Sequence, residues 1–314
     1  MTELHILQAF MAILCLYLGA EALVKGSLKI AAIFGISPLV AGLTIVSLGT
    51  SLPEAVVSLM AQYSPGGSDI AITNIIGSNI SNIGLVLGLS IFLVPMKIEE
   101  RLQGKEYLFL LSTAVLLLFI SIWGSVLPII GLILILALFY YMYRHYKSAR
   151  VDLVGSIKIN RSSYEIILSI FMISGGSLLL FLGGNFLIES AVVLARYWGV
   201  SNRFIGITLV AIGTSLPELS ASLVAVFKKH HHIALGNIVG SNILNVLFVL
   251  GSVGCFAPIY SFASIIVVDA IVMLFFTLFL VYLIKSNDIL GRFKGALLLL
   301  LYSAYLLLLY YTRL

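Results

Sequence analysis

The sequence is dominated by long apolar runs, each close to the length that an α-helix needs to cross a lipid bilayer. A spanning helix takes about 20 consecutive, mostly apolar residues, and this chain of 314 residues has ten such segments. Only 10% of its residues are charged, which is too few to cover the surface of a soluble domain. The sequence therefore predicts an all-α polytopic membrane protein. A soluble enzyme, a nucleic-acid-binding domain and a disordered chain are excluded.

The basic residues orient these spans. If the N-terminus lies outside, 15 of the 18 Lys and Arg residues fall in cytoplasmic loops, where loops of membrane proteins carry an excess of positive charge. We therefore expect both termini outside. The ten predicted spans are 5–24, 38–62, 70–95, 106–123, 126–143, 164–186, 203–227, 234–256, 262–284 and 294–312.

The two halves of the chain resemble each other. At an offset of 164, the segments 42–59 and 206–223 are identical at 11 of 18 positions and share Gly-Thr-Ser-Leu-Pro-Glu. A second shared block, Gly-Ser-Asn-Ile-x-Asn, occurs at 77–82 and 240–245. This predicts a first repeat at 1–143, a cytoplasmic connecting loop at 144–163 and a second repeat at 164–314. Each repeat holds five spans, an odd number, so the second copy is expected to be inverted, as in many secondary transporters.

The first shared block places polar groups inside a predicted span. Its proline removes a backbone donor and frees a carbonyl one turn earlier, and a freed carbonyl in hydrocarbon needs a partner. Its glutamate, Glu54 in one copy and Glu218 in the other, is costly in the membrane unless its charge is compensated. The hydroxyls are those of Thr50, Ser51, Thr214 and Ser215.

The second block adds a serine and an asparagine four residues apart, on one helical face. These are Ser78 and Asn82, matched by Ser241 and Asn245. The combined inventory is all oxygen, which suits hard cations such as calcium better than zinc or copper. Small polar residues also pack membrane helices together. A glutamate in both copies favours a cation site, although some hydroxyls can serve packing alone.

These paired blocks resemble the two alpha-repeats of the sodium/calcium exchangers, within the cation/calcium exchanger superfamily. The chain length, the ten spans and the two halves are similar to the compact prokaryotic members, so the resemblance covers essentially the whole chain. Calcium/proton antiporters of the same superfamily usually carry a Gly-Asn-x-x-Glu type of block, which is absent here.

The resemblance implies four central cation sites in a diamond and a site set carried over from both repeats. Calcium would be held mainly by the two glutamates, sodium ions would occupy the surrounding positions, and the first and sixth helices would slide over the other eight. Many of these exchangers have aspartate where this chain has Asn245. The site here therefore has only two central negative charges, and the sequence does not fix the coupling ratio. The implied ligands are Thr50, Ser51, Glu54, Ser78, Asn82, Thr214, Ser215, Glu218, Ser241 and Asn245, with backbone carbonyls near Ser47 and Ala211.

The sequence thus favours a secondary antiporter that exchanges sodium for calcium in the cell membrane of a prokaryote. A calcium or other cation antiporter driven by protons is the main alternative, and a cation channel is a third. No paired Asp, catalytic Ser and His, or HExxH arrangement occurs on the spans, so no enzyme activity and no cofactor are expected. The expected partners are sodium, calcium and the lipid bilayer, and one chain can suffice as a monomer.

Overall fold

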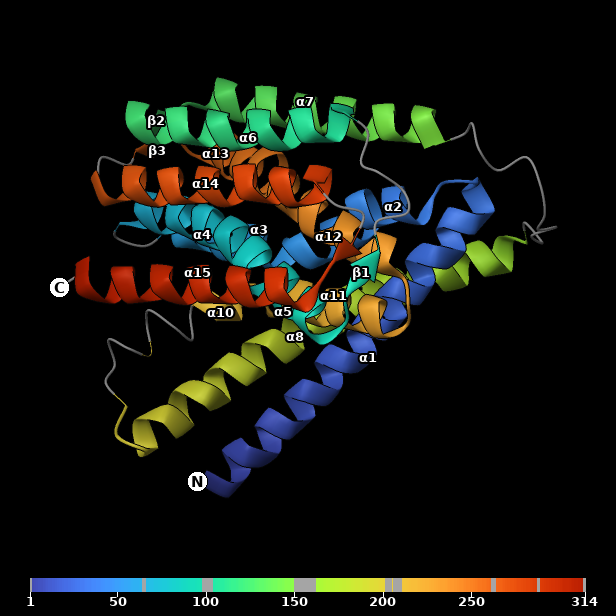
Figure 1. Ribbon diagram of the computed structural model, residues 1–314, viewed down its shortest axis with the longest axis horizontal. Coiled ribbons are helices and arrows are strands. Elements are labelled where there is room, and N and C mark those ends of the chain that lie inside the picture. The colour runs from blue at the N-terminus through green and yellow to red at the C-terminus, as the bar shows by residue number, and fades with distance from the viewer. Residues whose placement is uncertain are drawn as a thin grey trace.

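Membrane-length helices make up nearly the whole molecule (Figure 1). The computed structural model describes residues 2–63, 66–97, 104–149, 162–200, 205, 211–260, 264–286 and 289–312. Within these residues, nine helices are long and apolar enough to cross a bilayer. The predicted span 203–227 is described only in part, as a short helix, a turn and a second apolar helix. The all-α membrane fold predicted from the apolar runs is confirmed.

The first half begins with one long helix, followed by broken helices and two straight ones. Its elements are α1 (Thr2–Phe34), α2 (Pro38–Ala41), the π-helical turn η1 (Gly42–Val46), α3 (Ser47–Ala61), α4 (Gly67–Ser81), the π-helical turn η2 (Asn82–Leu87), α5 (Gly88–Leu93), β1 (Met96–Lys97), α6 (Gly104–Trp123), β2 (Ser125–Val126) and α7 (Pro128–Ala149).

The second half repeats this order. Its elements are α8 (Ser163–Tyr197), α10 (Ala211–Gly213), α11 (Leu216–Phe227), α12 (His231–Leu244), the π-helical turn η4 (Asn245–Leu250), α13 (Gly251–Phe256), β3 (Ile259–Tyr260), α14 (Ser264–Ser286), β4 (Ile289–Leu290) and α15 (Arg292–Thr312). α7 includes 144–149, the first residues of the predicted connecting loop, and most of that loop lies outside the described residues.

The helices α1, with 33 residues, and α8, with 35 residues, end 10 and 11 residues beyond the predicted spans 5–24 and 164–186. The apolar run marks only the part of a helix that suits hydrocarbon, whereas backbone hydrogen bonds continue wherever the residues allow a helix. Each long helix ends at a glycine with positive φ, Gly35 at 68° and Gly199 at 78°. The next amide donates to the same carbonyl position in both halves, Ile36 to Ala31 and Val200 to Ala195, at 2.9 Å each. The two ends are equivalent at the offset of 164.

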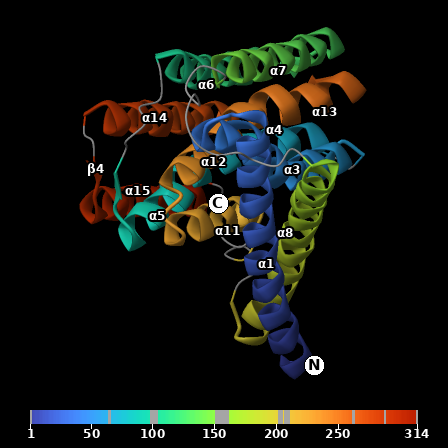
Figure 2. The same ribbon diagram turned by 90° about the vertical axis from the view of Figure 1, so that its right-hand side faces the viewer.

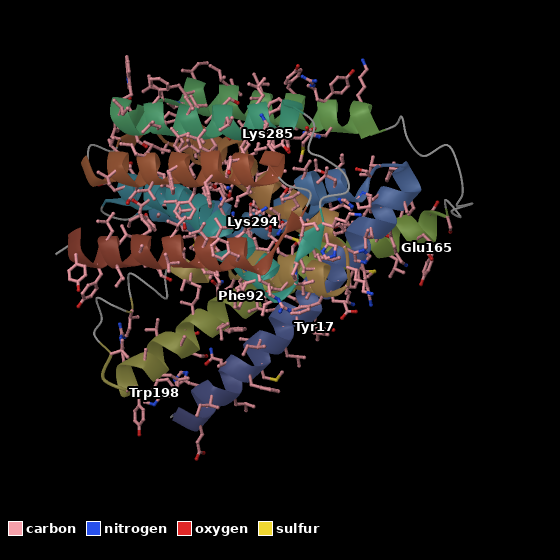
Figure 3. All side chains as sticks on the ribbon, viewed as in Figure 1. Tyr17, Phe92, Glu165, Trp198, Lys285 and Lys294 are labelled. Carbon is pink, nitrogen blue, oxygen red and sulfur yellow. The ribbon has the colours of Figure 1, made fainter. Side chains whose placement is uncertain are left out.

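The helices α1 and α8 lie side by side and run obliquely to the others, projecting beyond them at one end (Figures 1 and 2). Figure 3 shows Trp198 at the projecting end of α8. Their backbones approach closely where both helices carry glycine: a Cβ on Gly19 would lie 2.8 Å from the Gly176 carbonyl oxygen. This close contact fits the small-residue packing typical of membrane helices.

The α1–α8 pair contacts α3 at Gly49, where a Cβ would lie 2.6 Å from the Ser177 hydroxyl and 3.0 Å from Leu23 Cδ1. Between α8, α3 and α7 lies an apolar cavity of about 540 Å³, lined among others by Leu48, Leu52, Ile173 and Phe181. Glu21 of α1 also forms ion pairs with Lys25 of the same helix and with Lys228 just after α11. The pair therefore borders an apolar cavity beside α3 and makes a polar contact next to α11.

The remaining helices pack in matched pairs across the two halves. α5 packs on α15 as α13 packs on α7, and α6 packs directly on α14. The short strands match as well, β1 pairing antiparallel with β4 and β2 with β3. In Figure 1, β2 and β3 lie at the left end of the stacked helices α6, α7, α14 and α15, and β1 lies toward their right end. Equivalent elements at opposite ends are what an inverted duplication requires, although the inversion itself stays a prediction.

Candidate cation site

The two predicted glutamates lie in the centre of the molecule. Glu54 is on α3 and Glu218 is in the first turn of α11, and both side chains are fully buried. The two helices that carry them, α3 and α11, pack against each other. α3 is continuous through Pro53, whereas α10 and α11 are separated at Thr214 and Ser215. The repeated hexapeptide therefore lies within one helix in the first half and at a break in the second.

The other predicted ligands surround these glutamates. Ser78 lies on α4 and Ser241 on α12, while Asn82 and Asn245 are the first residues of the turns η2 and η4. π-helical turns inside α-helices are frequent at functional sites. Of the predicted side-chain ligands, only Thr214 is partly exposed; besides the two glutamates, the buried ones are Thr50, Ser51, Ser78, Asn82, Ser215, Ser241 and Asn245.

Contacts across the two halves bring these residues together. The Thr50 hydroxyl lies 3.4 Å from the Ser241 hydroxyl, and the Ser78 hydroxyl lies 3.3 Å from that of Thr214. These two contacts are equivalent under the repeat. Thr50 Oγ1 also lies 3.1 Å from Asn237 Oδ1. The candidate site is thus formed jointly by both repeats, as the sequence predicted.

The carbonyl positions are described less fully. The Ser47 hydroxyl donates to the Leu43 carbonyl at 2.8 Å within its own helix, and the Ser47 carbonyl accepts from Thr50 at 3.2 Å. The Ser47 carbonyl, which the resemblance implies as a ligand, thus already accepts one hydrogen bond from within its helix. Ala211 begins α10, so its carbonyl precedes the break in the second half. The ligand roles of these two carbonyls stay predictions.

Several buried oxygens in the site have no hydrogen-bond partner among the described residues. They comprise both carboxylate oxygens of Glu54 and of Glu218, the hydroxyls of Ser51 and Ser215, and the amide oxygens of Asn82 and Asn245. A buried, uncompensated carboxylate costs several kcal/mol, and buried polar groups are normally paired. Carboxylate, hydroxyl and amide oxygens are the ligands that hard cations take. The arrangement can therefore compensate its charge by binding one or more cations.

The amide nitrogens at the same positions are satisfied. Asn82 Nδ2 donates to Asn242 Oδ1 at 3.1 Å, and Asn245 Nδ2 donates to Asn79 Oδ1 at 3.0 Å. Both bonds cross from one half to the other. Asn79 and Asn242 were not among the predicted site residues, although both stand in the shared Gly-Ser-Asn-Ile-x-Asn block. Their repetition was the signal that could have identified them.

Asn237 is a second residue that the sequence reasoning missed. It is fully buried, and besides accepting from Thr50 it donates to the Ser222 hydroxyl at 3.0 Å. Its repeat equivalent, Asn74, donates to the Ser58 hydroxyl at 2.9 Å. Asn74 and Asn237 are 163 residues apart, the same offset that relates the two Gly-Ser-Asn-Ile-x-Asn blocks, so the repeated asparagine was again visible in the sequence.

The chain matches a family model described as "Sodium/calcium exchanger protein" over residues 4–147 and again over 168–311. The two matches correspond to the two predicted repeats. The sodium/calcium exchanger MaX1 of Methanosarcina acetivorans is 29% identical over 354 residues, covering 99% of this chain and 100% of the relative. The uncharacterized membrane protein MJ0091 of Methanocaldococcus jannaschii is 34% identical over 298 residues, covering 93% of each chain.

A solved structure shows the same fold. The sodium-calcium exchanger NCX_Mj, soaked with Na⁺ and Ca²⁺, superposes with a TM-score of 0.81 at 33% identity, covering 97% of this chain and 98% of that one. Crystals of the same exchanger soaked with Na⁺ and Sr²⁺ give a TM-score of 0.81 at 32% identity. The similarity therefore extends over nearly the whole length of both chains.

Proposed function

The chain belongs to the sodium/calcium exchanger protein family, and from this membership we propose that it exchanges sodium for calcium at the site between Glu54 and Glu218. The observation that supports this assignment is the pair of fully buried carboxylates whose four oxygens have no hydrogen-bond partner among the described residues. A buried carboxylate in a membrane interior is stable only when its charge is neutralised by a proton or compensated by a cation, and the oxygen-rich surroundings of this pair favour a cation. The proposed ligands are the residues predicted from the sequence, with both repeats contributing.

Charge decides which loads this site can carry. One calcium ion neutralises two carboxylates, and two sodium ions do the same. Both loads bind to the same oxygens, so binding of one excludes the other, which is the requirement for exchange by a single carrier. We propose that Ser51 and Ser215, whose hydroxyls are unpaired, complete the coordination from opposite sides of the glutamates.

The packing supports alternating access. α1 and α8 are joined by close backbone contact at their glycines, and an apolar cavity opens along part of the contact between α8 and α3. A helix pair that is rigid within itself and borders a cavity has room to shift as one body. We propose that this pair moves over the remaining helices and exposes the site to one side of the membrane at a time.

We propose that the N-terminus and the C-terminus face the outside of a prokaryotic cell membrane. The basic residues support this orientation: Lys285 and Lys294 lie at the ends of α14 and α15 that adjoin β1, whereas Trp198 lies at the projecting end of α8 (Figures 1 and 3). The site is made by one chain, so we expect a monomer to be sufficient for exchange.

Uptake of radioactive calcium into proteoliposomes tests the function. Vesicles loaded with sodium and diluted into sodium-free buffer should accumulate calcium, and vesicles loaded with choline should not. Glu54→Gln should abolish uptake because it removes one of the two central charges. Glu189→Gln is the matched control, since Glu189 is an exposed carboxylate on α8 that accepts from Gln8 at 3.2 Å, and it should retain uptake.

The alternatives give different results in the same vesicles. Uptake that follows an imposed pH gradient without sodium would identify a proton-driven antiporter. Ion flux far above carrier rates, independent of any counter-ion, would identify a channel. Calcium binding that is unchanged in Glu54→Gln would refute the site assignment.

A further inference from the structure

Four asparagines form a symmetric cluster where α4 and α12 meet, next to the proposed cation site. Asn79 and Asn82 come from the first half, and Asn242 and Asn245 come from the second. All four side chains are at most 3% exposed. Two bonds described above link each ligand asparagine to the opposite half: Asn82 Nδ2 donates to Asn242 Oδ1, and Asn245 Nδ2 donates to Asn79 Oδ1.

Two further bonds fix the direction of these amides. Asn79 Nδ2 donates to the Asn242 backbone carbonyl at 3.3 Å, and Asn242 Nδ2 donates to the Asn79 backbone carbonyl at 3.4 Å. A backbone carbonyl can only accept a hydrogen bond. The NH₂ groups of Asn79 and Asn242 must therefore face these carbonyls, and their Oδ1 atoms must face the opposite way.

The orientation of Asn79 and Asn242 in turn determines the orientation of the two ligand amides, Asn245 and Asn82. Because Asn79 presents Oδ1, the group of Asn245 that faces it must be the NH₂ donor. The same reasoning applies to Asn242 and Asn82. The Oδ1 atoms of Asn82 and Asn245 are consequently turned away from these bonds, and both are buried without a hydrogen-bond partner among the described residues. An amide in the reverse direction would present N–H groups, which a cation cannot use as ligands.

We propose that Asn79 and Asn242 are positioning residues for ion exchange, each holding the ligand amide of the opposite repeat with its oxygen facing the cations. This proposal rests on the proposed function. It means that each repeat supplies the asparagine that orients a ligand amide of the other repeat. Asn245 carries no charge, so it contributes only through the direction of its amide dipole. A carboxylate can ligate a cation through either of its two oxygens, whereas an amide can do so only through one. Positioning by Asn79 and Asn242 is therefore needed most where the ligand is an asparagine instead of an aspartate.

A cycle of single and double variants separates this role from simple packing between the halves. Asn242→Ala, Asn82→Ala and the double variant are purified, and equilibrium binding of radioactive calcium is measured without sodium, followed by displacement with sodium. Loss of a residue that orients a metal ligand typically lowers affinity about 10- to 100-fold. We expect such a loss for Asn242→Ala, and no further loss when Asn242→Ala is added to Asn82→Ala, since residues that act through one another are not additive.

The matched control is Tyr305→Phe. The buried Tyr305 hydroxyl donates to Asp269 Oδ1 at 3.1 Å between α15 and α14, so its removal costs a similar buried hydrogen bond without releasing a ligand amide. It should leave both affinities unchanged. If Asn242→Ala does not fold, the symmetric cycle of Asn79→Ala with Asn245→Ala tests the same role from the other half.

Each outcome is decisive. Unchanged affinity in a folded Asn242→Ala variant, additive losses in the double variant, or an equal loss in Tyr305→Phe would overturn the positioning role. If the wild-type chain binds calcium and Glu54→Gln does not, these results overturn the positioning role alone. A wild-type chain that binds neither ion overturns the proposed function, and the positioning role with it.

Discussion

The contact between α1 and α8 makes a quantitative prediction at two adjacent glycines of α8. A Cβ on Gly176 would lie 2.7 Å from both the Gly19 carbonyl oxygen and the Leu23 amide nitrogen of α1. Both are backbone atoms, so neither can move aside without shifting the helix. A Cβ on Gly175, one residue earlier, would meet no described heavy atom within 4 Å. Gly175 and Gly176 are therefore neighbours in the same helix, but only Gly176 lies in the contact with α1.

The magnitudes follow from two opposing effects. Alanine is favoured over glycine inside a helix by about 0.5–1 kcal/mol, and both variants gain this. Overpacking a well-packed contact costs about 1–3 kcal/mol, and only Gly176→Ala incurs it. We expect Gly175→Ala to be neutral or slightly more stable than the wild type and Gly176→Ala to be less stable. The gap between them should be about 1–3 kcal/mol, the size of the overpacking cost.

Thermal unfolding in detergent, followed by the loss of the monodisperse peak on size-exclusion chromatography, measures this difference. One kcal/mol shifts the midpoint by about 2–4 °C in domains of 150–250 residues, so a chain of 314 residues should show a separation of a few degrees. A Gly176→Ala variant as stable as Gly175→Ala would refute the close helix contact. Sodium-driven calcium uptake should fall in Gly176→Ala as well, because a displaced α1 can no longer move with α8 as one body.

Three further changes test the electrostatics of the molecule. Lys228→Met should destabilise the protein by about 0.2–1 kcal/mol, because Lys25 still pairs with Glu21; a thermal shift as large as that of Gly176→Ala would contradict this. Partial burial beside Lys228 lowers the pKa of His230 from its ordinary value of 6.5. As the pH drops below 6.5, the unfolded chain therefore binds a proton at His230 more readily than the folded chain does, and the stability of the fold should decrease. Thermal scans at several pH values should find that this part of the pH dependence is missing in His230→Asn. Asn245→Asp removes the donor to Asn79 Oδ1, so the new acid must keep a proton to preserve that bond. Calcium binding should therefore depend more steeply on pH than in the wild type, where protons compete only at Glu54 and Glu218.

The sequence predicted the number, type and approximate position of the helices because hydrocarbon imposes a length and a composition on each span. It placed the ends of the first and sixth helices wrongly, since hydropathy falls after about residue 24 while the helix of α1 continues to Phe34. Those ends are set by backbone geometry at Gly35 and Gly199. The duplication made the two ends equivalent, and a comparison of the two glycines in the aligned halves would have located both.

The site residues were predictable for a different reason. Glu54 and Glu218 stand out because charge is rare inside a span, and the structure places both at the centre, fully buried. Asn79 and Asn242 lacked that signal, because asparagine is common at helix contacts and its role here depends on which atom each amide presents. Amide direction follows from the crossing of α4 and α12 and from the carbonyls that lie there. No linear pattern contains that information.

The charge of the site limits the exchange ratio. Within the described residues, Glu54 and Glu218 are the carboxylates at the centre, while Asp269 accepts from Tyr305 at 3.1 Å and Glu106 lies 3.8 Å from His145, on the outer helices. A site with two negative charges is neutral with one calcium ion or with two sodium ions, and a third sodium ion would leave a buried positive charge, which is costly in the membrane interior. We therefore expect electroneutral exchange of two sodium ions for one calcium ion. Calcium uptake that is insensitive to a potassium diffusion potential set with valinomycin would agree, and uptake that rises with the potential would show that a further charged group or a third sodium ion takes part.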